Sequence, residues 1–188
     1  LSPPFPDEHA AYLLLEVAGA EDLAERFSTL LSAIGFESRD VVIGIDSAQQ
    51  ERLWRYREAH SEAIAHLGIP QKLDITVPLS SMTSFVTRVK SLVKAHCPSA
   101  VTWLFGHAGD GNLHVNVTGA MFNDLALDRL VLELVAELGG SISSEHGIGR
   151  AKAGHLHLNR TTDELHLARR IKNAFDPVGI LNPGVLLT

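Results

Sequence analysis

Apolar residues along this chain of 188 residues recur at two spacings, and each spacing predicts one type of element. Apolar residues at alternate positions predict half-buried strands, whereas spacings of three and four predict amphipathic helices. On this basis we expect strands over residues 12–17, 41–45, 72–77, 101–105 and 112–117. Helices are expected over residues 21–34, 47–66 and 125–138, after Pro78, and after Thr161.

Local signals predict where several helices begin and end. Ser47 is expected to cap the second helix, and Thr161 with Glu164 has the pattern of a capping box before the last one. Asp176, followed by a proline, should end that last helix. The order of the elements predicts an α+β fold with one antiparallel sheet and helices against one face, although a mixed sheet could have the same order.

Polar side chains concentrate in residues 106–116, which contain two histidines, two asparagines and an aspartate around three glycines. Within the predicted strand 112–117 the apolar and polar residues alternate, so His114 and Asn116 should point to the same face. The glycines before the strand suit positive φ angles or a close approach of the backbone to a ligand. A functional site is therefore expected on this polar face, with His107 at its edge.

A second polar cluster, residues 143–150, contributes Glu145 and His146. His107, His114 and Glu145 could bind a divalent metal, because two imidazoles and one carboxylate leave a coordination position open on zinc, as in catalytic sites. The histidines could equally be hydrogen-bonded members of a polar sheet face. Both interpretations stay open at this point. Asp110 could orient a metal-binding histidine or hold its own turn.

Composition limits the class of protein. A chain with 45% hydrophobic and 20% charged residues is typical of one globular domain. The net charge of −6, without a run of lysine or arginine, argues against a nucleic-acid partner. We expect no integral membrane segment, because no apolar run approaches the ~20 residues of a spanning helix. The single cysteine, Cys97, excludes an internal disulfide and fits a cytoplasmic location.

Three motifs carry a resemblance. They are Gly-His-x-Gly-Asp-Gly-Asn-x-His-x-Asn at 106–116, Ser-Glu-His-Gly-Ile-Gly at 144–149, and Ile-Leu-Asn-Pro-Gly-Val-Leu at 180–186. Together they resemble the C-terminal domain of FAD-linked oxidases, flavoproteins of the vanillyl-alcohol oxidase type that include D-lactate, D-2-hydroxyglutarate and glycolate dehydrogenases. The resemblance covers essentially the whole chain, so residues 1–188 are expected to form one such substrate-binding or cap domain.

The resemblance implies a ferredoxin-like antiparallel sheet and an FAD-binding domain on the N-terminal side of this one. Because the sequence begins at Leu1 and lacks the glycine-rich loops of such a domain, we expect it to be a fragment that is inactive alone. The resemblance also implies an electron acceptor as a partner, and a homodimer is a further expectation.

Residue roles follow from the same resemblance. Arg57 matches an arginine that binds the substrate carboxylate, with Ser61 one helical turn later, and Lys72 matches a basic position that binds a second carboxylate in some members. Arginine suits this task because its planar guanidinium can hold a carboxylate with two parallel hydrogen bonds. Asn116 could orient the substrate, and Glu145, His146 and Asn182 are expected near the flavin.

The implied activity is the oxidation of a 2-hydroxy acid to a 2-oxo acid, with hydride transfer to FAD. His146 is the candidate base for the hydroxyl proton. A metal at His107, His114 and Glu145, with zinc as the candidate from its ligand types, would lower the pKa of the alcohol. Two alternatives are a metal-dependent hydrolase, which would use the same ligands with an activated water, and a non-catalytic capping or metal-binding module.

Overall fold

The computed structural model describes residues 1–19 and 23–187 and divides the chain into two compact units, Leu1–Ala63 and Ile64–Thr188. The first unit contains α1 (Ala24–Ala33), a 3₁₀ turn (Ser38–Asp40), α2 (Ser47–Glu58) and the start of α3 (His60–Ala65). None of its described side chains is buried. The helix expected over 21–34 is present as α1, and its first two predicted positions lie outside the described residues.

Two predicted strands in the first unit are wrong. Residues 12–17 and 41–45 form no strand, and most apolar side chains of the first segment, such as Leu13 and Leu15, are exposed. Alternating apolar residues favour an extended backbone, but a strand also needs a second strand to accept and donate its hydrogen bonds. Within the described part of the unit, neither segment has such a partner.

The helix expected over 47–66 is divided in two. Its cap is Asp46, whose carboxylate accepts the Gln49 N–H at 2.8 Å, so the predicted cap at Ser47 is one residue late. The division falls at Ala59. The His60 Nδ1 lies 2.9 Å from the Arg57 carbonyl oxygen, the acceptor that a continuous helix would offer to the N–H four residues later.

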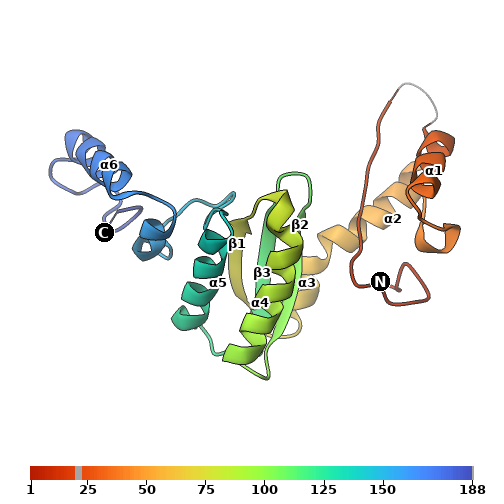
Figure 1. The fold of residues 1–188 in the computed structure, drawn as a ribbon, viewed down its shortest axis with the longest axis horizontal. Coiled ribbons are helices and arrows are strands. Elements are labelled where there is room, and N and C mark those ends of the chain that lie inside the picture. Colours follow the sequence, from red (N-terminus) through yellow and green to blue (C-terminus); the bar gives the residue numbers. More distant parts are fainter. Residues whose placement is uncertain (20–22, 188) are drawn as a thin grey trace. The chain divides into compact units, whose positions relative to one another are not determined.

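The second unit is built on a three-stranded antiparallel sheet, which confirms the predicted α+β class (Figure 1). The strands are β1 (Gln71–Thr76), β2 (Val101–His107) and β3 (Asn112–Thr118), in the order β1-β3-β2. Ser141 forms an isolated antiparallel bridge with Thr76 on the free edge of β1. This is the strand order of a ferredoxin-like sheet in which one bridging residue takes the place of the fourth strand.

Two helices cover one face of this sheet (Figure 1). A 3₁₀ turn (Leu79–Ser81) leads from β1 into α4 (Met82–His96), and α5 (Leu125–Glu137) follows β3. The alternation predicted for β3 places Leu113, Val115 and Val117 on the helix side, where all three are buried. They pack with Phe85, Val89 and Val93 of α4 and with apolar residues of α5 in a single core.

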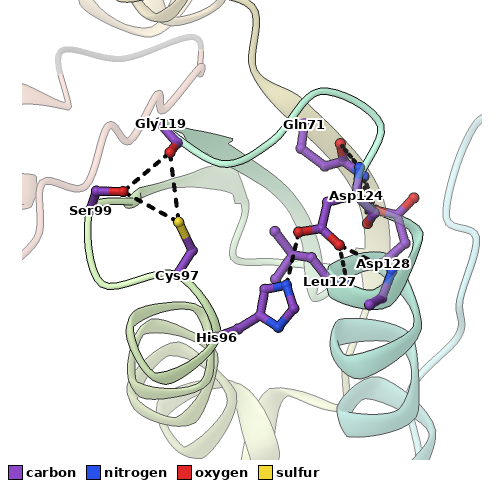
Figure 2. Close-up of polar contacts among 9 residues, drawn as sticks. Gln71, His96, Cys97, Ser99, Gly119, Asp124, Leu127 and Asp128 are labelled. Atoms are coloured by element: carbon purple, nitrogen blue, oxygen red, sulfur yellow. Dashed lines mark hydrogen bonds and ion pairs between the residues drawn. The ribbon is translucent and has the colours of Figure 1, made fainter.

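Asp124 ties the start of α5 to the end of α4 (Figure 2). Its Oδ1 accepts the N–H groups of Ala126 and Leu127, which caps the helix, and its Oδ2 lies 2.8 Å from His96 Nε2. Gln71 of β1 donates to the Asp124 carbonyl oxygen and to Asp128. Beside this cluster, the half-buried Cys97 lies 3.7 Å from the Gly119 carbonyl oxygen, its hydrogen-bond acceptor.

The remaining elements are a 3₁₀ helix, Ala153–Leu158, and α6, Thr162–Phe175. The predicted capping box is confirmed, because Thr161 accepts the Glu164 N–H and the Glu164 side chain accepts the Thr161 N–H. The helix ends at Asp176 as predicted.

Candidate functional site

The face of the sheet opposite α4 and α5 is polar, as predicted for His114 and Asn116. Residues paired across antiparallel strands point to the same face, so three rows of side chains cross it. In the order β1, β3, β2, the rows are Lys72, Asn116 and Trp103; Asp74, His114 and Phe105; and Thr76, Asn112 and His107.

Two glycines of the 106–116 motif serve the backbone rather than a ligand. A Cβ on Gly106 would lie 2.1 Å from the Asn112 carbonyl oxygen. Gly111 has φ +75°, and a Cβ there would lie 2.1 Å from the Val77 carbonyl oxygen. Asp110 holds this turn, since its Oδ1 accepts the Asn112 N–H at 2.9 Å. The glycines thus allow β2 to turn closely into β3 and bring His107 beside the polar face.

His114 is the centre of a group of rings on this face. Its ring centroid lies 5.0 Å from that of Phe105, 6.5 Å from that of His107 and 6.3 Å from that of His146. The Nδ1 of His107 lies 3.8 Å from Oε1 of Glu145. The structure therefore brings together the four residues that the sequence singled out from segments about thirty residues apart.

Asp74, which sequence reasoning missed, joins these segments. Its Oδ2 accepts backbone N–H groups from three consecutive residues, Ser144 at 3.2 Å, Glu145 at 2.8 Å and His146 at 3.4 Å. Its Oδ1 accepts from Asn112 Nδ2 at 2.8 Å and lies 3.5 Å from His114 Nδ1. The side chain is 5% exposed, so these groups replace water around the charge.

The charge of Asp74 is stabilised in this position. Burial alone would raise the pKa of its carboxyl. Hydrogen bonds from the Glu145 backbone, Asn112 and the His146 backbone together lower this pKa by more than burial raises it, so it lies below the ordinary value. The half-buried Lys152 donates to the Asp74 carbonyl oxygen at 2.7 Å. Burial lowers the pKa of Lys152, while the negative charges of Asp74 and Asp128 act in the opposite direction.

The same contacts explain why the segment expected to deliver Glu145 leaves the sheet. Ser141 and Thr76 exchange two backbone hydrogen bonds, of 3.0 and 2.8 Å. If the strand ladder continued, its next hydrogen-bonded pair would place a backbone N–H on the Asp74 carbonyl oxygen. That oxygen instead accepts a hydrogen bond from Lys152, and the Asp74 carboxylate accepts the backbone N–H groups of residues 144–146. Thr76 Oγ1 also donates to Ser144 Oγ at 2.6 Å.

The predicted metal ligands are neighbours without forming a metal site. The donor types of His107, His114 and Glu145 suit a divalent ion, yet in the part of the chain that is described no three histidine, cysteine, aspartate or glutamate side chains are arranged to hold one. The separation of the two imidazole centroids is wider than a shared tetrahedral ion requires.

The predicted substrate-binding residues are divided between the units. Lys72 is exposed on the polar face and lies opposite the buried Asn116. Arg57, half-buried at the end of α2, and Ser61, exposed in α3, belong to the first unit.

Asn182 lies in the C-terminal tail, in a turn with φ +46° whose carbonyl accepts the Val185 N–H. The tail is attached just after the Glu145 loop: Leu186 N donates to the Gly149 carbonyl at 3.1 Å, and Arg150 donates to the Pro183 carbonyl at 3.0 Å. Glu145, His146 and Asn182 are all exposed, as a contact with a flavin held by another domain would require.

The sequence of nearly the whole chain matches one known family. Residues 2–186 match the family described as FAD linked oxidases, C-terminal domain. The chain belongs to this family. Its relatives include a D-2-hydroxyglutarate dehydrogenase of Xanthomonas citri pv. viticola, 36% identical over 97% of this chain, and one of Stutzerimonas stutzeri, 35% identical over 96%. A mitochondrial D-2-hydroxyglutarate dehydrogenase of Bos taurus is 34% identical over 96% of the chain.

This FAD-linked oxidase C-terminal domain spans 41% of the length of each of the two bacterial relatives and 34% of the bovine one. FAD is the cofactor that the family name gives. Among the helices of the described residues, none is long and apolar enough to cross a membrane. The cytoplasmic location stays a prediction.

The site residues missed by sequence reasoning in this FAD-linked oxidase domain are Asp74 and Phe105. The alternation of β1 held a signal for the first, because a carboxylate stands at the centre of a strand whose other face is apolar. Phe105 gave no comparable signal, since it reads as one more core residue of an apolar strand.

Proposed function

We propose that this domain is the substrate-binding half of an FAD-dependent dehydrogenase that oxidises a D-2-hydroxy acid, with D-2-hydroxyglutarate as the first candidate. The observation that carries the proposal is the gathering of His107, His114, Glu145 and His146 over one polar sheet face. Family membership supports the flavin, and the names of the relatives support the substrate.

The reaction removes a proton and a hydride from the C–OH group of the substrate. The hydroxyl loses a proton and the carbon loses a hydride, which leaves a 2-oxo acid. When bound, FAD accepts the hydride. The chain must supply a base for the proton, and we assign this role to the exposed His146, whose backbone N–H is bound by Asp74.

Binding of the acid needs groups for two carboxylates if it is D-2-hydroxyglutarate. We assign Arg57 and Ser61 to the carboxylate next to the reacting carbon and Lys72 to the distal one, with Asn116 as an orienting amide. Lysine suits the distal group because a flexible point charge can follow a mobile chain end. Glu145, His146 and Asn182 are assigned to the edge of the flavin.

A divalent metal, with zinc as the candidate, is a further part of the proposal. His107, His114 and Glu145 would hold it after rotation of the exposed His107 and Glu145 side chains. Their donor types support this assignment, but the observed arrangement does not meet the geometry. Metal analysis of the purified full-length protein, before and after chelation, tests this part separately.

Anaerobic flavin reduction tests the function itself. The full-length protein is mixed without oxygen with D-2-hydroxyglutarate, D-lactate or glycolate, and the visible spectrum is recorded. Bleaching of the flavin by D-2-hydroxyglutarate, and slower or no bleaching by the two monocarboxylates, is the expected result. A flavin band that none of the three acids bleaches would contradict the proposal.

A further inference from the structure

Asp74 has a set of contacts that no role in the reaction has yet used. It lies on the polar face in the middle of β1, directly opposite His114. Six groups of the protein meet it: three backbone N–H groups of 144–146, Asn112 Nδ2 and His114 Nδ1 at its carboxylate, and Lys152 Nζ at its carbonyl oxygen. Asp74 thus binds the segment that carries Glu145 and His146 with two of its groups, the carboxylate and the backbone carbonyl.

We infer that Asp74 is a positioning residue, which fixes the Glu145–His146 loop and the ring of His114 relative to one another in the geometry that turnover needs. The inference rests on the proposed function. Of the five groups around the carboxylate, three belong to Glu145, His146 and His114 of the candidate site, and a fourth, the Ser144 N–H, directly precedes Glu145.

The arrangement of the loop supports this role. Three consecutive N–H groups around one carboxylate oxygen form a concave anion-binding nest, which restricts the backbone more than a single hydrogen bond would. The side chains of Glu145 and His146 leave this nest on an otherwise exposed loop. Without the carboxylate the three N–H groups would bind water, and the backbone from which the Glu145 and His146 side chains project would no longer be held in one position.

The contact with His114 supports it independently. A carboxylate 3.5 Å from Nδ1 favours the tautomer with the proton on that nitrogen, which leaves the Nε2 lone pair as the acceptor. A carboxylate in this place is a recurrent means of orienting an imidazole that binds a ligand.

A matched control exists within the same unit. Asp124 is also buried, also accepts backbone N–H groups and also meets a histidine, His96, but it lies with Gln71 on the helix side of the sheet (Figure 2). Asp74→Asn and Asp124→Asn therefore remove the same charge from similar surroundings, only one of which faces the site.

The two variants are made in the full-length flavoprotein. Measurements are kcat and KM for D-2-hydroxyglutarate, the flavin content and the hydrogen exchange of peptides covering 142–150. We expect Asp74→Asn to lower kcat roughly 10- to 100-fold with KM and flavin content nearly unchanged, and to speed exchange at 144–146. Asp124→Asn should leave kcat and this exchange close to the wild type.

A wild-type kcat in Asp74→Asn, or an equal loss in both variants, would overturn the inference. If Asp74→Asn does not fold, Asp74→Glu tests the inference in its place, because this variant keeps the charge and moves it by one methylene. Its kcat should still fall at least about 10-fold. If no hydroxy acid reduces the wild-type flavin, the proposed function fails, while faster exchange at 144–146 in Asp74→Asn alone would still establish the anchoring.

Discussion

Gly111 and Val77 are in direct backbone contact, and the contact leaves no room for a side chain. The Gly111 carbonyl accepts the Val77 N–H at 3.0 Å, and a Cβ on Gly111 would lie 2.1 Å from the Val77 carbonyl oxygen. The turn that carries His107 to the polar face therefore depends on a glycine at this position.

We expect Gly111→Ala to destabilise the domain by about 1–3 kcal/mol or more, because the positive φ and the clash act together. Gly109→Ala, two residues earlier in the same turn, is the control, since a Cβ there meets nothing within 4 Å. Thermal unfolding of both variants measures the difference. Equal midpoints would show that the turn tolerates a side chain at 111.

Two side-chain contacts between α4 and α5 should differ in their contribution to stability. Asp124→Ala removes both the cap of α5 and the contact with His96, so we expect a loss of about 1–2 kcal/mol. Arg88→Ala breaks the two exposed hydrogen bonds with Glu137, whose loss should cost less, because water screens the charges of an exposed pair. Urea unfolding of the two variants at neutral pH tests the order, which a larger loss in Arg88→Ala would reverse.

The contribution of Asp124 should also depend on pH. Hydrogen bonds from the Leu127 backbone and from His96 hold the pKa of this carboxyl below its ordinary value of 3.8. A carboxyl with a lowered pKa in the folded state contributes stability above its unfolded pKa and loses it as the pH falls through the folded one. The gap in unfolding free energy between wild type and Asp124→Ala should therefore narrow as the pH falls below 3.8. A gap that widens on acidification would contradict this assignment.

Two phenylalanines of the second unit differ strongly in burial and should therefore differ in their contribution to stability. Phe85 is fully buried between α4 and the sheet, whereas Phe122 is 78% exposed. Phe85→Ala should cost about 3–5 kcal/mol through lost burial and the cavity left behind. Phe122→Ala should change stability by less than about 0.5 kcal/mol. Thermal unfolding of both variants checks the prediction, and similar midpoints would place Phe85 outside the stabilising core.

Histidine variants separate the two roles proposed for the cluster. His146→Ala should lower kcat by about 10²- to 10⁴-fold as the loss of a base does, while bound metal is retained. His107→Ala should lower both turnover and metal content. His157→Ala is the control, because His157 bonds the Gly154 carbonyl outside the cluster. Full turnover in His146→Ala would require a different base, and unchanged metal content in His107→Ala would remove this residue from the ligand set.

Sequence patterns predicted the second unit better than the first. The elements β1, β3, α4 and α5 follow from their apolar periods because each contributes buried residues to one shared core, and α6 follows from its capping box. Residues 12–17 and 41–45 have a strand-like pattern, but the pattern reports half-burial and contains no information about a pairing partner. The separation of α2 from α3 depends on a local contact of His60 that no period records.

The site was predictable in its residue types and less so in its connections. His107 and His114 follow from one strand pair, and Glu145 with His146 from a dense polar motif. The role of Asp74 was missed although the alternation of β1 shows a carboxylate at its centre, because three of its partners are backbone N–H groups as far as 72 residues away, which leave no mark in the sequence.

The Ser141–Thr76 bridge marks the point where the strand ladder ends and the loop that carries Glu145 and His146 begins. The strand ladder is complete before the chain departs at Ser143, so insertions or exchanges in the following loop would leave the strand register intact. Sequence changes in this loop are therefore compatible with the fold as long as each new loop presents the backbone N–H groups that the Asp74 carboxylate accepts.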